Sequence, residues 1–252
     1  MIKVSNLSKL YGETIVVDNV SLDIPIGGVT AIIGPNGAGK STLLSMISRL
    51  LNKSSGSVLI DNLNIDKTNT RELAKRLGIL KQENHIPLRL TIRELVAFGR
   101  FPHSGGQLKA NDEAHIQNSI YYMGLQDMEN YFLDELSGGQ RQRAFLAMVL
   151  CQDTNYILLD EPLNGLDMKH AVSMMKVLRK ACDELGKTVV MVIHDLNFAS
   201  CYADTIIAMK NGKVIHNGSP DELIVPDLLS NLYDTSVSVH KINGQRICIH
   251  YT

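Results

Sequence analysis

The feature that most constrains the fold is a glycine-rich octapeptide set between two segments of opposite structural preference. The run before it, Val29 to Ile33, has the length and composition of a buried strand. The run after it, from Thr42 to about Leu50, is rich in helix formers. The octapeptide itself is Gly34-Pro35-Asn36-Gly37-Ala38-Gly39-Lys40-Ser41. Strand, glycine loop and helix in this order predict an α/β fold with a ligand site at a strand end.

The octapeptide fits the pattern G-x-x-x-x-G-K-[ST], which binds phosphate groups. Glycines let the backbone wrap phosphates, while N–H groups and the helix N-terminus supply positive potential. The pattern predicts that Lys40 reaches the β- and γ-phosphates of a nucleotide and that Ser41 ligates Mg²⁺. A plain glycine turn is the alternative, but the flanking strand and helix are those that the motif requires. We therefore expect Gly34 to Thr42 to form a nucleotide-binding loop.

Two further apolar runs end in side chains suited to nucleotide chemistry. Tyr156 to Leu159 leads into Asp160 and Glu161, and carboxylates at the tip of a buried strand are costly unless used. We expect Asp160 to hold Mg²⁺ and Glu161 to act as general base for water. Glu161 as a merely solvated loop acid is the alternative, which the phosphate loop makes less attractive. The run Thr188 to Ile193 leads into His194. A lone histidine there could be an ordinary loop residue, but the ends of parallel strands gather at one side of the sheet, so we expect His194 to face the γ-phosphate.

The remaining pattern alternates between strands and helices. Ala171, Met174, Leu178, Ala181 and Leu185 repeat at helical spacing between two apolar strands, which predicts a βαβ unit. Capping-box pairs predict three helix starts, at Thr91 with Glu94, Ser137 with Gln140, and Ser219 with Glu222. Asn-Gly turns predict one hairpin near residue 211 and another near residue 243.

Composition excludes several classes of protein. A net charge of -1 argues against a chain whose main partner is nucleic acid. The four cysteines are scattered without a CxxC pair, so neither a disulfide framework nor a zinc site is expected. No apolar run approaches the roughly 20 residues of a membrane span. We expect a cytosolic chain unless a partner holds it at a membrane.

The stretch LSGGQRQR, Leu136 to Arg143, is a second glycine-rich helix start, but no strand pattern leads into it. Together with the phosphate loop and the run YILLDEP that begins at Tyr156, it resembles the ATP-binding subunit of an ATP-binding cassette (ABC) transporter. The resemblance implies two subunits arranged head to tail. Each ATP would lie between the phosphate loop of one subunit and Ser137, Gly138, Gly139 and Gln140 of the other.

The same resemblance assigns four more features. Tyr11 matches the aromatic residue that stacks on adenine, and Gln82 matches the glutamine that contacts Mg²⁺ or the attacking water. Asn164 to Asp167 matches the loop that crosses to the partner subunit, and His194 matches the switch histidine. The segment from Gln82 to His103 is expected to dock a helix of a separate membrane permease.

Leu90 to His103 and Leu159 to His170 resemble more closely the ATPases that import iron–siderophore complexes, especially of the catecholate type, into Gram-positive bacteria. Related ATPases serve haem and cobalamin importers, which stay open as alternatives. This resemblance implies a peripheral subunit on the cytoplasmic face of the membrane, linked indirectly to a substrate-binding lipoprotein. A soluble ABC ATPase acting on ribosomes or DNA, or a scaffold without turnover, fits less well.

The expected architecture is one ABC ATPase domain over residues 1–252, in class α/β. A P-loop NTPase core would comprise residues 1–85 and 151–215, with an antiparallel β subdomain. A helical signature subdomain would be inserted at residues 86–150, and residues 216–252 would be a C-terminal extension packed on the core.

Overall fold

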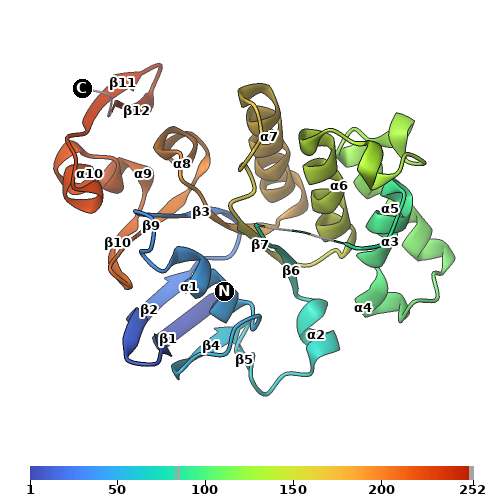
Figure 1. The fold of residues 1–252 in the computed structure, drawn as a ribbon, viewed down its shortest axis with the longest axis horizontal. Helices are drawn as coiled ribbons and strands as arrows, with labels where there is room; N and C mark the ends of the chain where they lie inside the picture. Colours follow the sequence, from blue (N-terminus) through green and yellow to red (C-terminus); the bar gives the residue numbers. More distant parts are fainter. Residues whose placement is uncertain (83, 85, 250–252) are drawn as a thin grey trace. The chain divides into compact units, whose positions relative to one another are not determined.

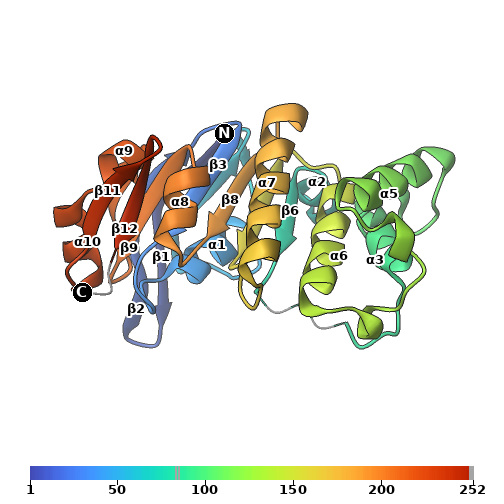
Figure 2. The same cartoon turned by 90° about the horizontal axis from the view of Figure 1, so that it is seen from above.

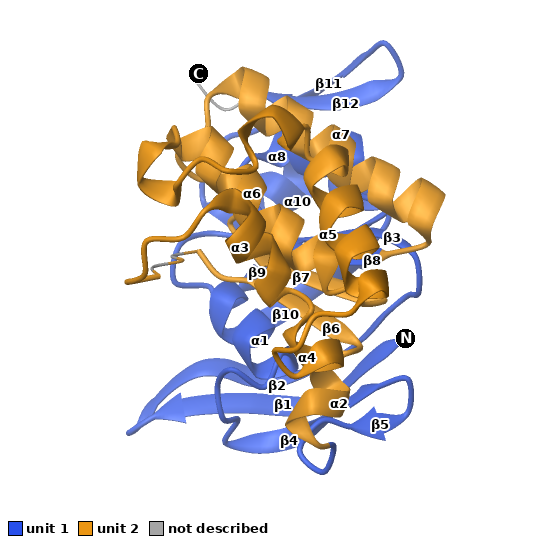
Figure 3. Cartoon of the chain, turned by 90° about the vertical axis from the view of Figure 1, so that its right-hand side faces the viewer, with its two compact units in different colours: residues 1–68, 188–252 blue, residues 69–187 orange. Residues whose placement is uncertain are grey.

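A computed structural model describes residues 1–82, 84 and 86–249, and these fall into two compact units. Unit 1 comprises residues 1–68 together with the chain from 188 onward, and unit 2 comprises residues 69–187 (Figure 3). Residues 83, 85 and 250–252 lie outside the described part, so the predictions for residues 82–103 and 216–252 are assessed without them.

Unit 1 contains an antiparallel sheet with the strand order β2-β1-β4-β5. Its strands are β1 (Ile2–Tyr11), β2 (Thr14–Ile24), β4 (Ser55–Ile60) and β5 (Leu63–Asn64) (Figure 1). Ile2, Val4 and Leu7 of β1 are buried, whereas Lys3 is exposed. This alternation is typical of a sheet with one face packed on a core.

Unit 1 also contains strands in the order β10-β9-β3-β8. They are β3 (Gly28–Ile33), β8 (Thr188–Val192), β9 (Thr205–Lys210) and β10 (Lys213–Gly218). Strand β3 runs parallel to both β8 and β9, and β10 forms the predicted hairpin with β9 across Asn211-Gly212. Every residue of β8 is buried, as expected for a parallel strand covered on both faces.

Helix α1 (Lys40–Ile47) begins two residues earlier than the sequence pattern indicated, because Lys40 and Ser41 of the phosphate-binding pattern form its first turn. The other helices of unit 1 are α8 (Leu196–Tyr202), α9 (Pro220–Leu223) and α10 (Pro226–Tyr233). The predicted capping box of Ser219 and Glu222 is present at α9.

The last predicted hairpin is also present, as β11 (Ser238–Ile242) and β12 (Gln245–Ile249). It packs on α8 (Figure 2). There the Asn197 side chain accepts a hydrogen bond from the N–H of Cys248 at 2.7 Å, and the Ser200 hydroxyl donates to the carbonyl of Arg246. The described part of the C-terminal extension is therefore built into unit 1.

Unit 2 is mostly helical. Its elements are α2 (Thr70–Ala74), β6 (Leu77–Leu80), α3 (Ile92–Phe98), α4 (Phe101–Ser104), α5 (Ala110–Tyr122), η1 (Gln126–Met128), η2 (Leu133–Glu135), α6 (Gly138–Cys151), β7 (Tyr156–Asp160) and α7 (Met168–Leu185). Helices α3, α5 and α6 pack together (Figure 1). A buried ion pair between Arg100 and Asp112, at 2.9 Å, joins the turn after α3 to α5. Strands β6 and β7 are parallel.

Helix α7 forms where the helical spacing predicted it. Ala171, Met174, Leu178 and Ala181 are buried as the spacing indicated, but Leu185 is 52% exposed. Leu185 is the last helical residue, and the chain reverses at Gly186 in the left-handed conformation, so the final turn extends beyond the core. Across the described residues no helix has the length and apolarity needed to span a membrane, and no disulfide joins the four cysteines.

Candidate functional site

The glycine-rich loop leaves the carboxyl end of β3 in a conformation that requires glycine at two positions. Gly34 has φ 144°, and a β-carbon there would lie 2.1 Å from the carbonyl oxygen of Met209. Gly39 has φ 94°, and a β-carbon there would lie 2.6 Å from the carbonyl oxygen of Val16. Larger residues would displace neighbouring backbone at both points. The loop is thus fixed in this shape, and because its glycines have no side chains they leave the backbone uncovered.

Lys40 is the charged residue of this loop, and it is 5% exposed. Its Nζ donates to the carbonyl of Gly34 at 2.8 Å and to that of Pro35 at 2.9 Å. The ammonium group therefore lies across the loop rather than in solvent. A positive charge held there beside backbone N–H groups and the start of α1 forms a site for anions such as phosphates.

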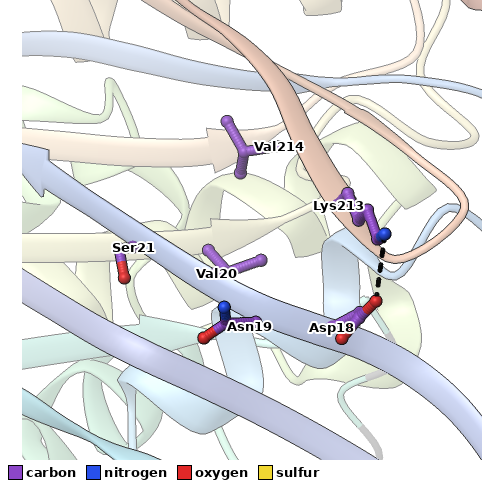
Figure 4. Close-up of a pocket in the computed structure, with 6 residues that line it drawn as sticks. All are labelled: Asp18, Asn19, Val20, Ser21, Lys213 and Val214. Carbon is purple, nitrogen blue, oxygen red and sulfur yellow. Dashed lines mark ion pairs between the residues drawn. The ribbon is translucent and has the colours of Figure 1, made fainter.

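The turn between β9 and β10 contacts the loop at Ala38. Gly212 donates its N–H to the carbonyl of Ala38 at 3.1 Å and accepts the N–H of Asp18 at 2.9 Å. The carboxylate of Asp18 also pairs with Lys213 at 3.2 Å, on the wall of a pocket of about 510 Å³ (Figure 4). Strand β2 and this hairpin together keep the loop in place.

The C-terminal part of unit 1 contacts the first residue of the loop, Gly34. The hydroxyl of Tyr233, at the end of α10, accepts the N–H of Gly34 at 3.1 Å. Burial raises the pKa of Tyr233 to about 12, so the hydroxyl stays protonated at physiological pH. No local pattern in the sequence pointed to this residue, since it lies 199 positions from its partner.

His194 lies at the same sheet edge as the loop. Strands β3 and β8 are parallel, with Ile32 opposite Val192, and Ile193 donates its N–H to Ile32. Their carboxyl ends therefore lie side by side, and His194 is exposed two residues after β8. Tyr11 lies at the end of β1 in the antiparallel sheet, where it is 52% exposed with the Nζ of Lys9 4.8 Å from the centre of its ring.

Unit 2 brings three predicted site residues to one sheet edge. Strands β6 and β7 are parallel, with Leu80 opposite Leu159, so Gln82 and the Asp160–Glu161 pair follow neighbouring strand ends. The side-chain amide of Gln82 donates to the carboxylate of Glu161 at 2.8 Å. Glu161 itself has φ 49°, an uncommon conformation for a residue with a side chain. A carboxylate oriented by an amide is a suitable base for a water molecule.

The stretch LSGGQ leads into α6: Ser137 is the N-cap, and Gly138, Gly139 and Gln140 lie in the first turn. The hydroxyl of Ser137 accepts the N–H of Gln140, and Gln140 accepts the N–H of Ser137 at 2.8 Å, which confirms the predicted capping box. Ser137 and Gly138 are exposed. Exposed backbone N–H groups at the start of a 14-residue helix suit an anionic ligand.

Two residues that the sequence did not single out, Gln142 of α6 and His170 of α7, lie where this helix meets the chain after β7. Gln142 donates to the carbonyl of Pro162 at 3.1 Å. A β-carbon on Gly139 would lie 3.1 Å from the ring of His170, whose Nδ1 lies 2.7 Å from the carboxylate of Asp167. Two hydrogen bonds from His170, mainly that of its backbone N–H and also that of its ring, hold the pKa of Asp167 below its usual range. The spacing Asp167–His170 is a helix-capping distance, which is the one local signal for this contact.

Unit 2 also carries an apolar groove of about 350 Å³. Its lining comes from α3, α4 and the loop after them: Leu90, Glu94, Ala97, Phe98, Phe101, Ser104, Gly106 and Leu108. Phe98 and Phe101 are 49% and 60% exposed. Arg71 donates to the carbonyls of Pro102 and His103, which fixes the short helix α4 at the edge of the groove.

Comparisons with known proteins agree on one family. The family model described as "ABC transporter" matches residues 17–164. The petrobactin import ATP-binding protein YclP of Bacillus subtilis (strain 168) is 52% identical, with all of both chains covered. The petrobactin import ATP-binding protein FatE of Bacillus anthracis is 48% identical, with 96% of each chain covered. The ATP-binding cassette MJ0796, solved as a dimer in a post-hydrolysis state with ADP and phosphate, superposes with a TM-score of 0.77 at 33% identity, over 87% of this chain and 99% of that one.

Proposed function

The chain belongs to the ABC transporter family and is an ATP hydrolase of that family, and we propose that it powers the import of an iron–siderophore complex. The observation that supports ATP hydrolysis is the loop of Gly34 to Ser41, with Lys40 lying across it. The import of an iron–siderophore complex is supported by the relatives YclP and FatE, since both are named for petrobactin import. Petrobactin is therefore the first substrate to test.

The proposed reaction is transfer of the γ-phosphoryl group of ATP to water. Loop N–H groups and Lys40 would bind the phosphates and neutralise the charge that develops on them. Glu161 would take a proton from the attacking water, and the 2.8 Å bond from Gln82 keeps its carboxylate oriented. His194, at the same edge as the loop, would contact the γ-phosphate, and Tyr11 would stack on the adenine.

We also propose that Mg²⁺ accompanies the nucleotide. The donor set fits this ion, because a hydroxyl (Ser41), an amide oxygen (Gln82) and a carboxylate (Asp160) are the oxygen ligands that Mg²⁺ prefers when several waters remain bound. The ion supplies charge neutralisation at the β- and γ-phosphates when bound. Asp160 comes from unit 2 and Ser41 from unit 1, so this shared role rests on the order of the motifs in the sequence.

The working form is proposed to be a head-to-tail dimer. Ser137, Gly138, Gly139 and Gln140 would bind the ATP held by the partner's phosphate loop. The exposure of Ser137 and Gly138 in one chain supports this, as does the dimeric form of the solved relative. ATP would then hold the dimer closed, and hydrolysis would let it open.

We propose that the apolar groove binds a short helix of a separate permease, which would place this chain on the cytoplasmic face of the membrane. Exposed Phe98 and Phe101 offer apolar area for one face of such a helix, and Glu94 offers a negative charge at the groove. Closure of the dimer would change access through the permease, which receives its cargo from a substrate-binding lipoprotein.

Transport into vesicles tests the whole proposal. The chain is reconstituted with its permease and binding protein, and uptake of radioactive iron from ferric petrobactin is measured with and without internal ATP. Haem, cobalamin and an unrelated ferric siderophore are offered in parallel. Glu161→Gln serves as the matched control, because it keeps the hydrogen bond to Gln82 but removes the base. ATP-dependent uptake of haem or cobalamin alone would contradict the iron–siderophore assignment.

A further inference from the structure

The segment after β10 has no role in the proposed reaction, yet it contacts the loop that binds the phosphates. The hydroxyl of Tyr233 accepts the N–H of Gly34, the first residue of that loop, at 3.1 Å. Tyr233 is the last residue of α10. The 17 residues 216–232 separate it in sequence from residue 215, where the predicted nucleotide-binding core ends. A residue of the C-terminal extension is thus a direct partner of the loop.

Gly34 is a sensitive point at which to hold the loop. Its φ of 144° turns the chain out of β3, and a β-carbon there would lie 2.1 Å from the carbonyl oxygen of Met209 in β9, so only glycine fits at this point. Gly34 is buried, and a buried backbone N–H left without its acceptor destabilises the conformation that holds it. The Tyr233 hydroxyl supplies that acceptor, so loss of the hydroxyl should let the start of the loop move.

Helix α10 is itself attached to the strand that limits Gly34. Lys210 donates to the carbonyl of Asn231 at 2.5 Å and pairs with Asp234 at 2.7 Å. Lys210 follows Met209 directly in β9. The end of α10, the end of β9 and the start of the loop therefore form one connected set of contacts within unit 1.

We propose that Tyr233 is a positioning residue for ATP binding, which acts through Gly34 to hold the phosphate loop in its binding conformation. The proposal rests on the proposed function, in which this loop binds ATP. Tyr233 acts on the loop and has no part in activating water, so its loss should affect ATP affinity and leave the chemical step nearly unchanged.

The test is steady-state ATP hydrolysis by Tyr233→Phe, with Tyr202→Phe as the matched control. Both changes remove one hydroxyl from a tyrosine that ends a helix of unit 1, but Tyr202 stacks on Phe198 and lies on α8. We expect Tyr233→Phe to raise KM for ATP about fivefold with kcat within about twofold, which corresponds to about 1 kcal/mol. Tyr202→Phe should match the wild type in both constants.

Lys210→Met is a second variant that tests the same contacts from the side of β9. It should also raise KM for ATP, because α10 loses its anchor, and circular dichroism should show a folded chain. An unchanged KM in folded Tyr233→Phe would overturn the inference, as would a fall in kcat with KM unchanged. A wild-type chain that fails to bind ATP would instead overturn the proposed function, and this inference with it.

Discussion

Two adjacent glycines, Gly138 and Gly139, should respond in opposite ways to the same substitution. Both lie in the first turn of α6. A β-carbon on Gly138 meets nothing within 4 Å, whereas one on Gly139 lies 3.1, 3.3 and 3.5 Å from three atoms of His170. Alanine at a compatible site stabilises a protein by about 0.4–1 kcal/mol, because it restricts the unfolded chain. Gly138→Ala should therefore gain this stability in full.

Gly139→Ala must first move the His170 ring. The ring is held by Asp167 at 2.7 Å, and turning it away breaks that bond, which costs about 0.5–1.5 kcal/mol. Imperfect repacking adds to the cost, so Gly139→Ala should be about 1–2 kcal/mol less stable than Gly138→Ala. For a chain of this size each kcal/mol shifts Tm by about 2–4 °C.

Thermal unfolding without nucleotide is the appropriate assay, since it separates packing from any role of these glycines in binding ATP. Gly138→Ala should melt above the wild type and Gly139→Ala below Gly138→Ala. Adding His170→Ala to both should reduce the difference, because the obstructing ring is gone. Equal melting temperatures for the two alanine variants would refute the reasoning.

Four other changes have defined outcomes. Lys40→Ala should lower ATP affinity or turnover at least tenfold, measured by nucleotide binding and phosphate release, because the positive charge of the loop is lost; an unchanged rate would contradict the role of Lys40 in binding phosphate. Glu161→Gln should bind ATP, hydrolyse it at least about 100-fold more slowly, and accumulate as a dimer on size exclusion; near-normal turnover would remove the base assignment. Ser137→Arg should abolish hydrolysis while the monomer still binds ATP, and equal loss of binding would mean that the motif acts within its own chain. Hydrogen bonds from the backbone of Lys109 and from the Arg100 side chain hold the pKa of Asp112 below its usual value. Asp112 therefore stabilises the fold above its unfolded pKa of about 3.9, and this contribution is lost as the pH falls further. Asp112→Asn should make the free energy of unfolding less dependent on pH in the acid range, and an unchanged dependence would contradict the role of the ion pair.

Much of the fold followed from local patterns. The octapeptide lies between β3 and α1 as predicted, and capping boxes mark the starts of α3, α6 and α9. Hydrogen-bonded caps and turns involve residues three or four positions apart, so their physics is contained in a short stretch of chain. The 52% exposure of Leu185 shows what such a pattern leaves open, since periodicity cannot tell where the core ends along a helix.

The sequence by itself determined which chemical groups this protein carries and where each would stand relative to a strand end or a helix start. A glycine loop with Lys40, an acid pair after β7 and the first turn of α6 could be placed that way because strand and helix geometry is local. Only the tertiary structure decided which groups support them. Tyr233 reaches Gly34 across 199 positions, Gln82 reaches Glu161 across 79, and His170 limits Gly139. These contacts arise from packing between elements distant in the chain, and packing depends on the whole arrangement of side chains.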